Sequence, residues 1–118
     1  MDSETIRKYC LKKKSVKESF PFGNSTLVFK VSGKIFLLLS LEAVPAQFNV
    51  KCDPEQAEIF REEYASVIPA YHMNKKHWNT IILNGNVPAG LIREMIDASY
   101  LLVIKTLPLK ERKRLGPL

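Results

Sequence analysis

The sequence predicts an α+β protein, a two-layer sandwich in which an antiparallel sheet packs against helices. Consecutive apolar segments are separated by short turns, as in neighbouring antiparallel strands. Segments with helical spacing stand before, between and after these strands. The length of 118 residues is that of one domain, so we expect residues 1–118 to form a single unit in the order α-β-β-β-α-β(β)-α.

The first helix is expected to start at Ser3 as its N-cap, with the carboxylate of Glu4 near the positive end of the helix dipole. Its buried stripe consists of Ile6, Tyr9, Cys10 and the stem of Lys13. The helix ends before "SFPFGNS", Ser19–Ser25, because Pro21 and Gly23 interrupt regular structure.

Three strands are predicted between residues 26 and 52. In "TLVFKV", Thr26–Val31, alternate side chains point to opposite faces. "KIFLLLSL", Lys34–Leu41, is apolar on both sides, which predicts a central strand covered on both faces for part of its length. "AQFNVKC", Ala46–Cys52, alternates again, and Ser32 with Gly33 predicts a two-residue hairpin turn.

A second helix is expected to begin at Asp53 as its N-cap, with Pro54 at the first helical position and Gln56 in a pattern like a capping box. Its apolar stripe consists of Ala57, Phe60 and Tyr64. Pro69 ends this region.

The last third of the chain predicts a strand in "HWNTIIL", His77–Leu83, with an additional short strand near Tyr71–Met73. A third helix opens at Pro88. Its buried stripe consists of Leu91, Ile92, Met95, Ile96, Ser99 and Val103. Pro108 stops or bends this helix, and residues 109–118 are expected to form a flexible basic tail.

The chain is basic, with 18 Lys and Arg against 12 Asp and Glu and a net charge of +6. Such a balance favours anionic partners, among them nucleic acid and acidic proteins. Part of the excess lies in two clusters, which are typical of solvated surfaces. They are Lys12–Lys14 near one end and Lys110, Arg112, Lys113 and Arg114 near the other.

Cys10 and Cys52 belong to no ligand-spaced pattern and lie in apolar surroundings, so we expect buried free thiols, as in a reducing cytoplasm. No hydrophobic segment follows Met1, so no signal peptide is expected. The longest apolar run, Ile35–Leu39, is too short to cross a membrane. These observations predict a cytoplasmic protein without membrane contact.

Catalytic and metal-binding patterns are sparse. His72 and His77 are not spaced to share one helical face, and no acid lies near them in the sequence. There is no GxSxG, P-loop or GxGxxG motif, and Glu62 and Glu63, being adjacent on a helix, diverge. We therefore expect a non-enzymatic protein with no catalytic residue, no metal and no cofactor.

"YHMNKKHWNT", Tyr71–Thr80, contains both histidines and the only tryptophan, and it has two interpretations. In the first, Lys75 and Lys76 contact phosphate while Trp78 stacks on an exposed base. In the second, Trp78 anchors a strand, the histidines cap backbone groups and the lysines are solvated. Spacing alone favours the second interpretation.

Several segments together resemble the MmcQ/YjbR family of small bacterial proteins over nearly the whole length. They are "FPFG" (20–23), "VFKVSGKIFLLL" (28–39), "VKCDPEQA" (50–57), "PAYHMNKKHWNTIIL" (69–83) and "SYLLV" (99–103). The resemblance implies a frataxin-like or secretion-chaperone-like α/β sandwich and DNA binding, with hairpins flanking a helix. The run "CLKKKSVKESFPFG", residues 10–23, is more basic than the family pattern.

The leading hypothesis is a DNA-binding protein that contacts phosphates through a basic loop and the sheet face. The residues expected to bind DNA are Lys75, Lys76, His77, Asn79, Asn74, Lys30, Lys34 and Lys51, and those of the structural motif are His72 and Trp78. Two alternatives stay open. One is a protein-interaction module, as a homodimer or with another partner, that uses an apolar sheet face formed by Val28, Ile35 and Leu37. The other is a small-ligand or metal site at the two histidines.

Overall fold

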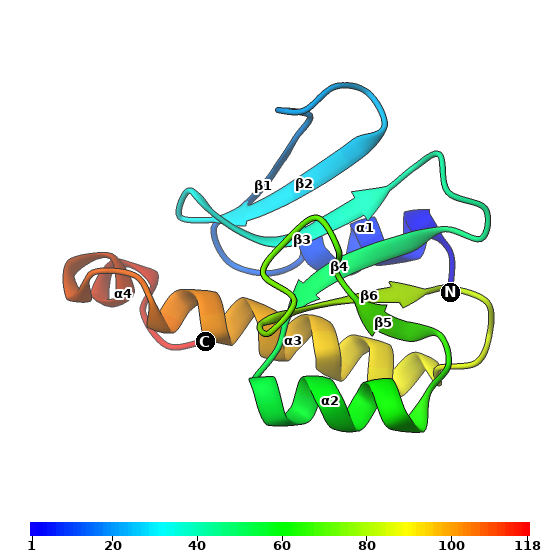
Figure 1. Cartoon of the computed structure of the whole chain (residues 1–118). Coiled ribbons are helices and arrows are strands. Elements are labelled where there is room, and N and C mark those ends of the chain that lie inside the picture. The colour runs from blue at the N-terminus through cyan, green and yellow to red at the C-terminus, as the bar shows by residue number, and fades with distance from the viewer.

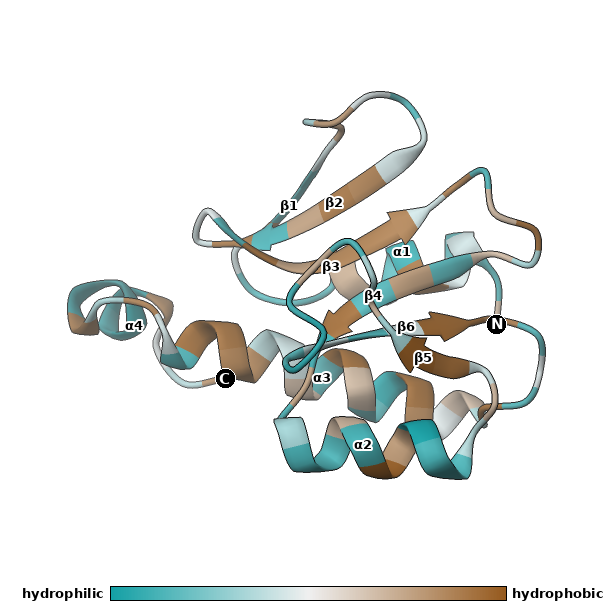
Figure 2. Ribbon diagram, viewed as in Figure 1, coloured by the Kyte–Doolittle hydropathy of each residue, from teal (hydrophilic) through white to brown (hydrophobic).

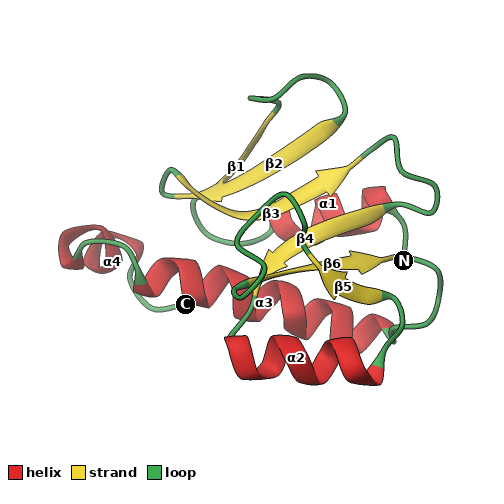
Figure 3. Cartoon of the chain, in the orientation of Figure 1, coloured by secondary structure: helices red, strands yellow, loops and turns green.

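The computed structural model describes residues 1–118, which form four helices and six strands. In chain order these are α1 (Ser3–Leu11), β1 (Val16–Ser19), β2 (Thr26–Val31), β3 (Lys34–Ser40), β4 (Gln47–Lys51), α2 (Pro54–Glu63), β5 (Val67–Pro69), β6 (Trp78–Ile82), α3 (Ala89–Lys105) and α4 (Leu109–Leu115). The strands form one antiparallel sheet in the order β1-β2-β3-β4-β6-β5 (Figure 1; Figure 3). The predicted α+β architecture is confirmed.

The two faces of the sheet differ. We call the face against α1, α2 and α3 the helix face, and the opposite one the open face. The helix face carries the core residues Leu27, Phe29, Val31, Leu37, Leu39, Phe48, Val50, Val67 and Ile81, all buried. They pack against the apolar side of α3, and Figure 2 shows hydrophobic residues concentrated in these strands and in this helix.

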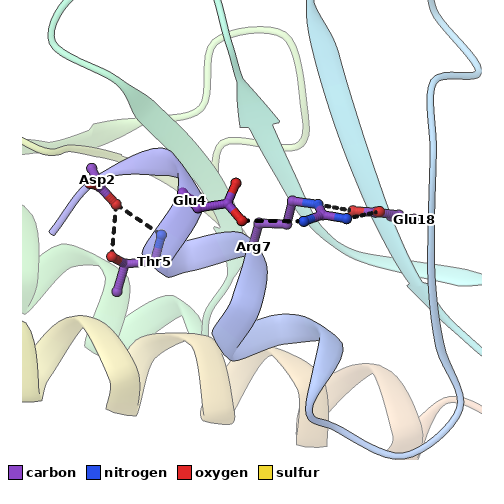
Figure 4. A network of polar contacts seen from close by, with 5 residues as sticks. All are labelled: Asp2, Glu4, Thr5, Arg7 and Glu18. Atoms are coloured by element: carbon purple, nitrogen blue, oxygen red, sulfur yellow. Dashed lines mark hydrogen bonds and ion pairs between the residues drawn. The ribbon is translucent and has the colours of Figure 1, made fainter.

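The start of the chain differs from the prediction. Asp2, and not Ser3, caps α1: its carboxylate accepts the hydroxyl of Thr5 at 2.7 Å and the backbone N–H of the same residue at 2.9 Å (Figure 4). These two hydrogen bonds hold the pKa of Asp2 below its usual value, and the bond from the hydroxyl has the larger effect. Arg7 then donates to both carboxylate oxygens of Glu18, at 2.8 and 2.6 Å, and so joins α1 to β1.

Strand β1 was not predicted, because it is short and mostly polar. Its four residues alternate half-buried and exposed side chains at the edge of the sheet. The hairpin that follows β2 confirms the prediction for its turn: Ser32 and Gly33 both have positive φ angles, 48° and 84°. Positive φ at both central positions gives a turn whose twist matches the two strands that it joins.

A β-bulge interrupts β3. Phe29 lies opposite Leu37 and Lys30 lies opposite Ile35, so Phe36 is an extra residue without a partner in β2. Phe36 and Leu37 are both fully buried, and the ring of Phe36 meets that of Tyr100 edge-on at 5.4 Å between centroids. The extra residue reverses the alternation of side chains beyond it.

Ser99 of α3 supplies the hydrogen bonds of this bulge. Its hydroxyl donates to the carbonyl of Phe36 at 2.6 Å and accepts the N–H of Lys51 at 2.9 Å. The side chain is completely buried, so both backbone groups are satisfied without water. Ser99, predicted only as part of an apolar stripe, therefore joins the helix to two strands.

The second half of the chain shows two further differences. The additional short strand exists, but it is β5 at Val67–Pro69, and Tyr71–Met73 belong to the loop that follows it. In place of a flexible tail, the basic segment Leu109–Leu115 forms helix α4, which extends beyond the sheet from the end of α3 (Figure 1). Leu115 is buried, and the ammonium of Lys14 donates to the carbonyl of Pro117.

The helix caps of the second half agree with the sequence. Asp53 caps α2 by accepting the N–H of Gln56 at 3.4 Å, with Pro54 at the first helical position, and Pro88 caps α3. No helix of the chain is both long enough and apolar enough to span a membrane.

Replacing Ser99 with Ala is expected to lower the free energy of unfolding by about 2–3 kcal/mol, because the carbonyl of Phe36 and the N–H of Lys51 lose a buried partner. Urea denaturation measures the change. Ser19→Ala is the control, since Ser19 is exposed on β1 and should change stability by less than ~0.5 kcal/mol. Equal stability of the two variants would contradict this account of the bulge.

Candidate functional site

The loop Tyr71–His77 lies over the open face and is held at its C-terminal end from α2. Arg61 of α2 donates from Nε to Asn79 Oδ1 at 2.7 Å, and from Nη2 to the carbonyls of Lys75 and Trp78. In the middle of the loop, Met73 reaches the sheet, where its sulfur lies 3.9 Å from Asn49 Nδ2. The loop is therefore fixed to the sheet as well as to the helix (Figure 1).

Asn79 was predicted to contact DNA, and this prediction is wrong. Its side chain is buried on the helix face, where Oδ1 accepts from Arg61 and Nδ2 donates to the carbonyl of Ala57 at 3.3 Å. The motif places Asn79 beside exposed lysines, but strand alternation turns it to the opposite face. It positions the loop and does not face solvent.

The other polar residues of the loop have separate surroundings. Lys75 is exposed, and its ammonium lies 5.2 Å from the centre of the Tyr71 ring, a cation–π contact. Lys76 lines a shallow hollow with Glu55 and Glu58 of α2, so its positive charge is partly offset. The two lysines, predicted as a pair, therefore contribute unequally to any anionic contact.

Asn74 closes the turn of the loop, because its Oδ1 accepts the N–H of Lys76 at 3.0 Å. His72 is exposed, whereas the side chain of His77 is half-buried. The backbone carbonyl of His77 accepts the N–H of Cys52 at 2.7 Å. Nowhere in the chain do three His, Cys, Asp or Glu side chains lie together as ligands for a metal ion.

The open face carries lysines that the strand register places in two groups. Lys17 of β1 lies opposite Lys30 of β2, which lies opposite Ile35 of β3. Lys51 of β4 lies opposite Trp78 of β6, and the register between β3 and β4 begins at Leu37 and Val50, beyond both groups. Since neighbouring strands are about 4.8 Å apart, the two groups together span roughly 19 Å across five strands. We call Lys17, Lys30, Ile35, Lys51 and Trp78 the lysine row.

Lys17 was not among the predicted residues, because strand β1 was not predicted. Lys34, by contrast, was predicted to bind DNA and lies elsewhere: beyond the bulge its ammonium turns to α3, 3.3 Å from the carbonyl and the hydroxyl of Thr106. The wrong assignment has a physical cause, because the bulge at Phe36 reverses the side-chain alternation.

The lysine row has no acidic counterpart. Glu18 is the only acid in the six strands, and it points to the helix side, where Arg7 binds it. The ion pairs of the chain join Arg7 to Glu4 and Glu18, Lys13 to Asp97 and Arg114 to Glu111, and none includes a lysine of the open face. Direct opposition of Lys17 and Lys30 is unfavourable to the sheet.

The predicted apolar sheet face is also corrected. Val28 and Leu37 have no exposed surface, and Leu37 lies on the helix face. Only Ile35 of the three is partly exposed, and it lies opposite Lys30. The open face therefore offers a partner mainly charge, with small apolar areas.

An apolar groove of about 400 Å³ lies between α2, α3 and the helix face, and sequence analysis did not predict it. Phe60, Met95 and Leu102 are among its lining residues. Phe60 and Met95 belong to the same stripes that bury the helices, so their pattern does not distinguish a groove from a core. Leu101 and Leu102 lie outside the predicted stripe of α3, and Leu101 is 45% exposed.

The two cysteines differ in accessibility. Cys10 is fully buried as predicted, and burial raises the pKa of its thiol to about 12. Cys52 was expected to be buried but is only partly so, because it lines the apolar groove. Burial also raises the pKa of the Cys52 thiol, and the carboxylate of Asp53 adds to the shift.

Fold and site together define a small α+β protein with one basic sheet face and a loop fixed across it. The YjbR family model matches residues 11–102 of the chain. The chain belongs to the YjbR family, as its sequence motifs predicted.

Two bacterial relatives match the chain nearly end to end. The chain is 38% identical over 115 residues to the uncharacterized protein YbdF of Escherichia coli O157:H7, covering 97% of this chain and 93% of that protein. It is 33% identical over 116 residues to the uncharacterized protein YjbR of Escherichia coli strain K12, with 98% of each covered.

Solved structures agree with the fold. The crystal structure of Deinococcus radiodurans protein DR2400, of domain family DUF419, matches with a TM-score of 0.91 at 38% identity over 99% of this chain and 89% of that one. A crystal structure of a Pseudomonas syringae protein matches with a TM-score of 0.76 at 29% identity, covering 86% and 98%. These names state no activity, so the function has to be argued from the site.

Replacing Asn79 with Ala is expected to lower the free energy of unfolding by about 2 kcal/mol, because Arg61 and the carbonyl of Ala57 lose their shared partner. Thermal or urea denaturation measures this loss. Asn24→Ala removes an exposed amide from the β1–β2 loop and serves as the control. If Asn79→Ala were as stable as the control, the anchoring role would be wrong.

A thiol reagent is expected to modify one cysteine in the folded protein and two after unfolding, because Cys10 is sealed and Cys52 is partly exposed. The raised pKa of Cys52 means that the neutral thiol dominates at neutral pH, so its modification should be slow and should accelerate as the pH rises. Stopped-flow absorbance measures the rates. Cys52→Ser should abolish the reaction of the folded protein, and rapid modification of Cys10 would contradict the buried position.

Proposed function

We propose that this protein is a non-enzymatic DNA-binding protein that contacts phosphates through the open face. The lysine row is the observation that carries the proposal: three lysines stand on one sheet face with no carboxylate in ion-pair contact. Lys75 extends this charge into the loop. Lysines arranged in this way supply sequence-independent contacts to a phosphate backbone.

The distribution of paired and unpaired charge supports this assignment. Lys13 has a half-exposed carboxylate partner in Asp97, and its ammonium lies about 5 Å from the rings of Tyr9 and Tyr100. Lys13 therefore belongs to the packing of α1 on α3, although its sequence cluster predicted a solvated surface. Lys17, Lys30 and Lys51 have no such structural role, and their mutual repulsion is relieved when an anion binds.

Binding should be measured by fluorescence anisotropy of labelled oligonucleotides, single-stranded and duplex, over a series of salt concentrations. If about four lysines meet phosphates, the logarithm of the binding constant should fall with the logarithm of salt concentration with a slope of about −3 to −4. Combined replacement of Lys17, Lys30 and Lys51 with Ala should weaken binding of every sequence by at least tenfold and reduce the slope by about 2–3.

The matched control removes three exposed lysines away from the open face, Lys8, Lys110 and Lys113, and so changes net charge equally. It should retain most of the affinity. If this control lost as much affinity as the lysine-row variant, either the total charge or the basic helix α4 would govern binding, and the proposed face would be wrong. Absence of binding at low salt to both forms of DNA would reject the function itself.

A further inference from the structure

We propose that the open face takes a single-stranded nucleic acid, with unpaired bases stacked on Trp78 and Tyr71. This inference rests on the proposed function and specifies the form of nucleic acid that the same site prefers. It follows from the position of two aromatic rings among the lysines and from the absence of a helix on this face.

Trp78 terminates the lysine row. It is the first residue of β6, it lies directly opposite Lys51 of β4, and strand alternation points both side chains to the open face. The indole is partly exposed, whereas its neighbour Asn79 is buried on the other face. A phosphate held by Lys51 therefore places the attached base beside an aromatic ring.

Tyr71 provides a second ring on the same side. It begins the loop that crosses the open face, it is 62% exposed, and the ammonium of Lys75 lies 5.2 Å from its ring centre. The pair combines a stacking surface with a cation for the adjoining phosphate. Aromatic rings among basic side chains are the arrangement by which proteins hold single strands without regard to sequence.

The arrangement of layers disfavours a duplex. Proteins that read duplex DNA commonly insert a helix into the major groove. Here α1, α2 and α3 cover the opposite face of the sheet, and the open face presents strands and a loop (Figure 1). Stacked base pairs would also hide the base surfaces from Trp78 and Tyr71, and a duplex would retain only the phosphate contacts.

The experiment compares a thymidine homopolymer single strand with a duplex of equal length, using the intact protein. Trp78 is the only tryptophan, so its intrinsic fluorescence reports on this position alone. The single strand is expected to bind about tenfold more tightly than the duplex at the same salt concentration, and to quench Trp78. Its slope of binding against salt should be shallower per phosphate contact, about −0.7 compared with about −0.9.

Variants separate stacking from charge. Tyr71→Ala should weaken binding of the single strand by about tenfold and change that of the duplex little, whereas Tyr71→Phe should keep the affinity. Phe22→Ala removes an equally exposed ring from the β1–β2 loop and should have no effect.

Equal or tighter binding of the duplex, or saturation by the single strand with unchanged Trp78 fluorescence, would overturn this inference and leave the proposed function standing. Failure of both nucleic acids to bind would overturn both.

Discussion

The bulge in β3, where Ser99 of α3 hydrogen-bonds the backbone, determines which residues the sheet offers to a partner. The bulge places the consecutive side chains of Phe36 and Leu37 in the core, and the Ser99 hydroxyl binds the carbonyl of Phe36 and the N–H of Lys51 on the neighbouring strand. Every residue of β3 before the bulge is shifted by one step. Ile35 thereby enters the open face opposite Lys30, while Lys34 leaves it for α3. The composition of the lysine row therefore depends on the bulge in β3.

A second polar contact connects the two faces. Arg61 approaches from α2 on the helix face, yet it binds the carbonyls of Lys75 and Trp78 at the end of the loop that crosses the open face. Asn79 completes the connection, because its amide satisfies both Arg61 and the backbone of α2. The position of the loop therefore depends on α2 as well as on its own residues, and a change in α2 would alter the surface that the loop presents.

Sequence reasoning succeeded where local chemistry decides the structure. The cap at Asp53, the turn at Ser32–Gly33 and the buried stripe of α3 follow from short-range rules, and they are confirmed except at Leu91, which is only partly buried. It failed where tertiary contacts decide.

Nothing local marks the bulge in an unbroken apolar run, so Lys34 was assigned to the wrong face. Asn79 was predicted to be exposed because its amide is polar. Its burial is tolerated because the amide binds Arg61, which lies 18 residues away in the sequence and so leaves no local signal. The edge strand β1 escaped notice because it is short and polar, and Lys17 was missed with it.

The cationic side chains form two groups: those that bind another part of the protein, and those that are available to a ligand. Each cation of the first group binds one partner in another element. Arg7 binds Glu18 of β1, Lys13 binds Asp97 of α3, and Arg61 binds Asn79 of β6. Each of these contacts joins parts of the chain that are distant in sequence, and the removal of Arg61 would also leave the buried amide of Asn79 without a partner.

Lys17 and Lys30 stand directly opposite each other without a counter-charge, an arrangement that opposes folding by a few tenths of a kcal/mol, up to about 1. No carboxylate of the sheet offsets this repulsion, because the one acidic residue in the strands, Glu18, faces the helices and binds Arg7. A surface of this kind gains most from a partner that supplies several negative charges at regular intervals, as a nucleic-acid backbone does.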